Sequence, residues 1–187
     1  MSAILDILGA SVLVGMIMLT VMSVNINMST QTYKSMSDFN IQTQTIQLAR
    51  IMEFDLYKMG YNLAKPAVAI AESSRLKFYA NLFDIPNGRD SVEYGLAGFV
   101  TSSPNPRDRM LYRYENTTRV LINFSATRFK LSYYTGKDSL LSAPVVGAWR
   151  DSIRSVRVLL TLESPEAFDN AYCGGYYEKL IYPRNLQ

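Results

Sequence analysis

The chain opens with a long, almost uninterrupted apolar segment. Residues Ala3 to Val24 read AILDILGASVLVGMIMLTVMSV and contain one charged side chain, Asp6. A helix of this length spans roughly 33 Å, which is enough to cross the hydrocarbon core of a bilayer. No basic segment precedes these residues and no small-x-small cleavage motif follows them. We therefore expect a retained membrane-inserting helix and not a cleaved secretory signal.

The helical pattern continues well beyond this segment. The chain has no proline or glycine between Met16 and Met59, and the first helix breakers are Gly60 and Pro66. Apolar residues at three- and four-residue steps form a stripe that can pack on a sheet: Leu48, Met52, Leu56, Met59 and Leu63. This part of the chain is therefore expected to be an amphipathic helix.

The region between the two apolar parts is more polar. From Asn25 to Gln47, Ser, Thr, Asn and Gln occupy 14 of 23 positions, and these residues are mediocre helix formers. The stretch is therefore either a weak helix or a flexible linker. If it is helical, Ala3 to Leu63 forms a rod about 90 Å long, which suits a filament better than an isolated soluble domain.

After Pro66 the pattern changes to alternating apolar and polar residues, which indicates β-strands. The segments RLKFYAN and SVEYGLA alternate in this way, and the Asn87-Gly88 pair between them predicts the turn of a hairpin. Further strands are expected in MLYRYEN, VLINFS and RFKLSYY.

Two more strands are expected towards the C-terminus. The longest is predicted between Asp151 and Glu163, where four residues face one way: Val156, Val158, Leu160 and Leu162. The tail YCGGYYEKLIYPRN predicts a glycine turn and a short edge strand that ends at Pro183.

Together these patterns predict an α+β fold. A long N-terminal α-helix, apolar in its first half, packs on one face of a mostly antiparallel sheet of five or six strands. The expected division is a membrane-inserting helix (1–24), its amphipathic continuation (25–63) and a β-rich globular domain (64–187).

Composition argues against most catalytic chemistry. The chain has no histidine and one cysteine, Cys173, which removes Ser-His and Cys-His pairs, histidine zinc sites and any internal disulfide. Its 19 Lys and Arg and 16 Asp and Glu are spread along the chain, so no nucleic-acid binding is expected. We expect no enzyme activity and no cofactor, and we interpret Cys173 as a small buried residue.

Three residues around the predicted hairpin turn are weak candidates for a calcium site: Asp84, Asn87 and Asp90. Their spacing does not fit an EF-hand loop, because Gly88 falls one place early and no glutamate closes the loop. Turn formation explains these residues without a metal.

Asp6 has two interpretations on the local sequence. It is either an interfacial acid near the positive end of the helix dipole, or a carboxylate kept to pair with a positive group on another chain. A carboxylate buried in a membrane helix costs about 2–3 kcal/mol, so either role must offset that penalty.

This order of features resembles the type IV pilins and pseudopilins. The similarity begins at SAILD, continues through ARIMEFDLYKMGYN and SSRLKFYANLFDIPNGRDSVEYGL, and extends to FKLSYYTG. Removal of Met1 would make Ser2 the first residue and Asp6 the fifth. Members of the family usually carry glutamate at that place, and it is understood to pair with the N-terminal amine of a neighbouring subunit.

The chain also departs from the family. It has aspartate where glutamate is usual, and no proline interrupts the helix before Pro66. The sequence also opens without the family's basic leader that ends in glycine, so either the leader is already removed, which makes Met1 the first residue and Asp6 the sixth, or processing differs. Within the family, the succession of segments is similar to the larger minor pilins and pseudopilins.

The resemblance implies a structural subunit of a type IV-like filament. Such a subunit waits in the bacterial cytoplasmic membrane with its domain outside, then enters an extracellular or periplasm-spanning filament through its N-terminal helix. Its expected partners are copies of itself or other pilin-like subunits, and Asp6 and Ser2 are the expected assembly residues. The alternative is a single-span membrane protein whose outer domain binds a ligand or partner.

Overall fold

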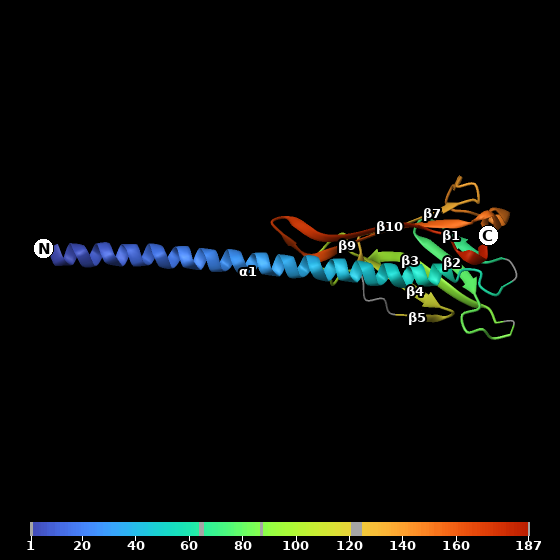
Figure 1. The fold of residues 1–187 in the computed structure, drawn as a ribbon, viewed down its shortest axis with the longest axis horizontal. Coiled ribbons are helices and arrows are strands. Elements are labelled where there is room, and N and C mark those ends of the chain that lie inside the picture. Colours follow the sequence, from blue (N-terminus) through green and yellow to red (C-terminus); the bar gives the residue numbers. More distant parts are fainter. Residues whose placement is uncertain (1, 64–65, 87, 121–124, 187) are drawn as a thin grey trace.

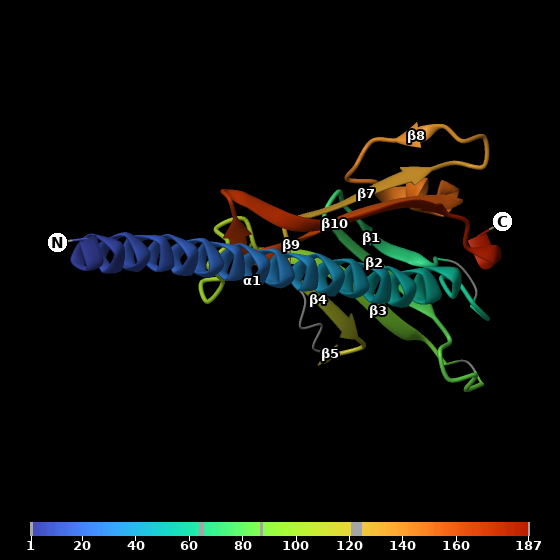
Figure 2. The same cartoon turned by 60° about the vertical axis from the view of Figure 1, so that its left-hand side comes forward.

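The computed structural model describes residues 2–63, 66–86, 88–120 and 125–186, and it shows a long helix joined to two antiparallel sheets (Figure 1). Helix α1 runs without a break over Ser2–Tyr57, a length of about 84 Å. The polar stretch from Asn25 to Gln47 is therefore helix and not linker. The first half of α1 projects from the domain, and the second half lies along its outside (Figure 2).

Helix α1 ends at Tyr57, six residues before the expected Leu63, because the chain turns at Gly60. Gly60 has a φ of +75°, which favours glycine at a helix C-terminus. Its N–H donates to the carbonyl of Tyr79 at 2.9 Å, so the helix end is tied directly to the first sheet.

The first sheet has the strand order β1-β2-β3-β4-β5, with β6 also paired to β4. Its strands are β1 Val68–Ala71, β2 Arg75–Ala80, β3 Asp90–Phe99, β4 Arg109–Glu115, β5 Thr118–Val120 and β6 Ser125–Ala126. The β2–β3 hairpin is confirmed, since Ala80 pairs with Asp90. Asn87 of its predicted turn lies outside the described residues, as do residues 121–124 of the expected VLINFS strand.

The second sheet has the order β10-β9-β7-β8. Its strands are β7 Arg128–Tyr134, β8 Leu140–Leu141, β9 Ser155–Phe168 and β10 Ala171–Ile181, and the 3₁₀ helices η1 Gly147–Ser152 and η2 Arg184–Leu186 complete the chain. The α+β class is confirmed. The expectation of one sheet with five or six strands is wrong, because the described residues form ten strands in two sheets.

The prediction for the C-terminal tail needs correction. The turn before β10 is made by Asp169 and Asn170, both with positive φ, and not by the glycine pair. Asp and Asn tolerate the left-handed region that a two-residue hairpin turn requires. Strand β10 is an edge strand as expected, but its 11 residues make it long.

The glycine pair lies inside β10, where α1 crosses it. A Cβ at Gly175 would clash with Thr45 Oγ1 and would lie 3.1 Å from the carbonyl oxygen of Ile41. A Cβ at Gly174 would have the carbonyl oxygen of Leu162 as its nearest neighbour, at 3.7 Å. Gly175 therefore lets the helix backbone approach the strand closely, and Gly174 does not have this role.

The helix and both sheets share one hydrophobic core. The predicted apolar stripe is confirmed at Leu48, Met52 and Leu56 on α1 and at Met59 in the turn that follows, all fully buried, whereas Leu63 is half-buried. Burial of these four side chains contributes roughly 6–12 kcal/mol of transfer free energy. From β9, the predicted row is buried as well: Val156, Val158, Leu160 and Leu162.

We expect Gly175→Ala to destabilise the protein by about 1–3 kcal/mol, because the added methyl pushes α1 away from β10. Gly174→Ala is the matched control and should stay within roughly 0.5 kcal/mol of the wild type. Chemical denaturation of the full-length protein in detergent, followed by circular dichroism, measures both. Equal effects at the two positions would contradict the close approach.

Candidate assembly helix and adjoining groove

The first half of α1 is apolar on all sides and has no cover. Every residue from Ala3 to Tyr33 is exposed. Among the described residues, one segment near the N-terminus is long and apolar enough to cross a membrane, and the domain buries none of it. A helix that is hydrophobic all round requires a nonaqueous environment, which a bilayer or other apolar helices can provide.

Asp6 lies in the second turn of α1, four positions after Ser2. The helix dipole acts mainly within the first turn, so it offers this carboxylate little stabilisation. No ion pair formed between described residues includes Asp6. No side chain of the described residues thus offsets its charge by an ion pair, and its assembly role stays a prediction.

The second half of α1 has a second apolar face, opposite the one that packs on the domain. At 100° per residue, Phe39, Ile46, Phe54 and Tyr57 point away from the buried side chains. Phe39 is 68% exposed and Phe54 is 60% exposed. The apolar surface of the membrane-inserting segment is therefore followed by an interrupted stripe on the outer face, which we call the outer stripe (Phe39, Ile46, Phe54 and Tyr57). The polar residues Thr43, Gln47 and Arg50 lie on the same face.

The hydroxyl groups of α1 find partners within the helix itself. The side chains of Thr20, Thr30, Thr32 and Thr45 each donate to the carbonyl four residues earlier, at 2.7–3.0 Å. A hydroxyl bonded in this way can be buried with a smaller desolvation cost. These threonines therefore do not prevent the helix from packing against another helix.

A buried ion pair joins α1 to the first sheet. Arg113 of β4 donates to both oxygens of Asp55, from Nε at 2.7 Å and from Nη2 at 3.3 Å, and the Tyr94 hydroxyl donates to the same carboxylate. Asp55 is 4% exposed. Burial and the Asp55 charge hold the pKa of Tyr94 well above its usual value, so Tyr94 stays a neutral donor.

Sequence reasoning missed Asp55, although a signal was present. It lies three residues after Met52 and four before Met59, within the buried register of the helix. A charged residue at such a position must be buried with a partner. The sequence does not show that the partner is Arg113, because the two residues are 58 positions apart.

A second polar contact ties α1 to the second sheet. Lys179 of β10 pairs with Glu53 at 2.7 Å, and the Tyr177 hydroxyl donates to the same carboxylate at 2.5 Å. Burial alone would raise the pKa of Glu53, but the bonds from Lys179 and Tyr177 outweigh burial and lower it. The helix is therefore held within one turn by two acids, one for each sheet.

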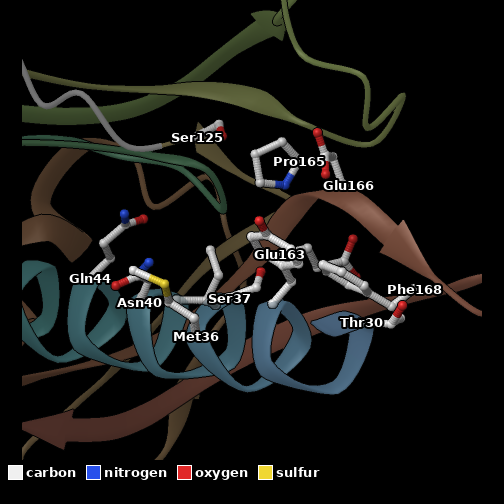
Figure 3. A pocket seen from close by; sticks show the side chains of 12 residues that line it. Thr30, Met36, Ser37, Asn40, Gln44, Ser125, Glu163, Pro165, Glu166 and Phe168 are labelled. Atoms are coloured by element: carbon white, nitrogen blue, oxygen red, sulfur yellow. The ribbon is translucent and has the colours of Figure 1, made fainter. Parts of the chain in front are cut away.

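An open groove lies between α1 and the end of β9 and has a volume of about 770 Å³ (Figure 3). It is lined by Thr30, Tyr33, Met36, Ser37, Asn40, Ile41, Gln44, Ser125, Glu163, Pro165, Glu166 and Phe168. Glu163 already pairs with Arg107 at 2.9 Å. Glu166 takes part in no ion pair between described residues, and no basic side chain lines the groove.

Two of the three weak calcium candidates, Asp84 and Asp90, lie among the described residues. Asp90 accepts hydrogen bonds from the Leu82 N–H and from Asn116 Nδ2, so both of its oxygens are engaged. Asp84 has a φ of +52°, and its negative charge raises the pKa of Tyr61. Asn87 lies outside the described residues. Over the described ranges, no three His, Cys, Asp or Glu side chains gather in a way that could hold a metal.

Cys173 is buried, as expected, at the contact between α1 and β10. Its Sγ lies 3.9 Å from the carbonyl oxygen of Lys34, and burial raises the pKa of the thiol. The residue fills space under the helix.

Comparison of the chain with protein-family models, curated protein sequences and solved structures finds no match in any of the three.

We expect Asp55→Ala to destabilise the protein by about 3–5 kcal/mol, because the buried Arg113 guanidinium loses the acid that two of its nitrogens bind and keeps only the more exposed Glu115, at 2.9 Å. The double variant Asp55→Ala/Arg113→Met removes both charges and should recover part of that loss. Glu178→Ala is the control, since it breaks only the exposed Arg157–Glu178 pair and should cost less than about 1 kcal/mol. Denaturation of the full-length protein in detergent measures all three. A loss at Asp55 no larger than the loss at Glu178 would contradict the role of the buried pair.

Proposed function

We propose that the chain is a pilin-like structural subunit of a type IV-like filament, either a pilus or a secretion pseudopilus, and not an enzyme. The subunit waits in the bacterial cytoplasmic membrane with its β-rich domain outside. It then enters an extracellular or periplasm-spanning filament through α1, beside copies of itself or of other pilin-like subunits.

The observation that carries this proposal is the outer stripe. A simple membrane anchor needs only an apolar segment that spans the bilayer. Here exposed apolar side chains recur between polar ones as far as Tyr57, about 50 Å beyond Val24 along the helix, on the face that the domain leaves uncovered. Helices of neighbouring subunits would cover this face along its full length.

The outer stripe also supplies a driving force for assembly. Lipid tails are as apolar as leucine, so the membrane-inserting segment gains little hydrophobic free energy when it moves from lipid to a bundle of helices. The outer stripe lies beyond that segment, in water, before assembly. Covering its four side chains contributes on the order of 3–6 kcal/mol per subunit, since each is already partly covered.

In this proposal Asp6 gives the assembly its register. A carboxylate without a partner in the core of a filament would carry a large desolvation cost. The N-terminal amine of a neighbouring subunit, at Ser2 after removal of Met1, would offset that cost only when the two helices are correctly aligned. Apolar packing alone lacks this directionality.

The alternative is a membrane-anchored protein whose domain binds a ligand or partner, and the groove beside α1 favours it. Asp6 separates the two functions, because an anchor needs no charged partner.

We expect Asp6→Ala to abolish filaments while the subunit stays inserted and folded, and Asp6→Glu to retain them, because only the second variant keeps a carboxylate. Electron microscopy of sheared cell-surface material, with membrane fractionation of the same cells, measures both properties. Normal filament yield from Asp6→Ala would reject the pairing.

The double variant Phe39→Glu/Phe54→Glu should also abolish filaments, because it puts charges into the outer stripe. Both side chains face away from the domain, so the fold and membrane insertion should be unchanged. Thr117→Glu, at an exposed turn of the first sheet, is the control and should assemble normally. Wild-type assembly by the double variant would show that the outer stripe is not an interface.

A further inference from the structure

One end of the domain carries an exposed apolar projection. Trp149 and Val146 lie in and just before η1 and are 65% and 57% exposed. Gly147 between them has a φ of +58°, which turns the chain outward. Trp149 is the sole tryptophan of the chain, and large exposed aromatic side chains are typical of binding sites.

The projection carries surplus positive charge. Arg150 donates to the carbonyl of Val145, and Arg154 donates to the carbonyls of Asp151 and Ile153. Neither arginine takes part in an ion pair between the residues that the structure describes. Arg89 lines a pocket with Arg150 and Asp151, and Asp138 lines another with Arg154, so the residues around these pockets carry three cations and two anions.

The groove beside α1 has apolar walls and a negative charge, and so complements the apolar surface and positive charge of the projection. Its walls include Tyr33, Met36 and Phe168, and Glu166 brings a carboxylate that no described residue neutralises. At about 770 Å³ it lies within the range of pockets that enclose a drug-sized molecule, so an indole ring and a neighbouring valine fit its volume.

The projection and the groove lie at opposite ends of the domain. Arg150 and Gly60 line the same small pocket, so η1 is close to the C-terminal end of α1, and Figure 1 shows it in orange near the C-terminus. The groove lies beside residues 30–44 of the helix. From Ser37 to Gly60 the separation along the axis is about 34 Å, so one chain cannot fill its own groove.

We propose that η1 of one copy, with Trp149 at its centre, inserts into the groove of a second copy, where Arg150 and Arg154 face Glu166. This contact rests on the proposed filament function. It joins two different surfaces, so each copy keeps a free projection and a free groove, and the contact propagates along the filament. Copies joined in this way are displaced by about 34 Å along the helix axis.

The single tryptophan makes the contact directly measurable. In the full-length protein in detergent, Trp149 should emit as a solvent-exposed indole and be readily quenched by acrylamide. In filaments of the same protein the emission should shift to the blue and quenching should fall. Trp149→Ala should reduce filament yield roughly tenfold or more. Phe99→Ala, an equally exposed aromatic at 68% that does not line the groove, should stay within about twofold.

Cross-linking identifies the surface that Trp149 meets. In a Cys173→Ser background that keeps Trp149 and Phe168, the double variant Ala148→Cys/Ala167→Cys places cysteines at exposed positions beside these two residues and should give a ladder of covalent oligomers in filaments. Each single-cysteine variant should remain monomeric, because a head-to-tail contact never brings two copies of the same residue together. The pair Ala148→Cys/Phe99→Cys is the control and should give no ladder.

The outcomes separate this contact from the proposed function. Absence of filaments from the wild-type protein would overturn both. Filaments in which Trp149 stays open to acrylamide would overturn the contact alone, and would leave the groove to another occupant such as a ligand. Dimers from Ala148→Cys by itself would replace the head-to-tail contact with a symmetric one.

Discussion

Helix α1 carries more apolar surface than its own domain covers, and this imbalance constrains the rest of the molecule. The domain buries one face of the second half, at Leu48, Met52 and Leu56. The first half and the outer stripe stay open along nearly the whole length of the helix. Exposed apolar surface of that extent is unstable in water, so the chain requires lipid, other helices or both in turn.

The way in which α1 is held decides which face stays open. Asp55 bonds to the first sheet and Glu53 to the second, and Gly175 lets the helix settle closely on β10. A rotation of the helix would leave the Asp55 carboxylate buried without Arg113, which is far costlier than a change in apolar packing. These polar contacts therefore give the helix one orientation, and the outer stripe follows from it.

The same orientation places the groove and the projection at the two ends of the domain. The groove forms where α1 leaves the end of β9, and η1 lies where α1 stops at Gly60. A rigid helix sets the distance between these ends. In a filament of such subunits, the helices would supply a continuous apolar core, and the contact proposed for Trp149 would join the domains outside it. Apolar packing between helices would hold the subunits together, and the charged pairs proposed between subunits would fix how neighbouring subunits align.

Local periodicity in the sequence was sufficient to predict the apolar N-terminal part of α1, its buried stripe and the alternating strands. Each of these features depends on residues only a few positions apart. It was misleading at Gly174 and Gly175, where composition indicated a turn and the turn belongs to Asp169 and Asn170. Only the tertiary structure decided the division into two sheets, the partner of Asp55 and the site of the groove. These features join residues tens of positions apart, and their pairing depends on how the whole chain packs, which no local pattern encodes.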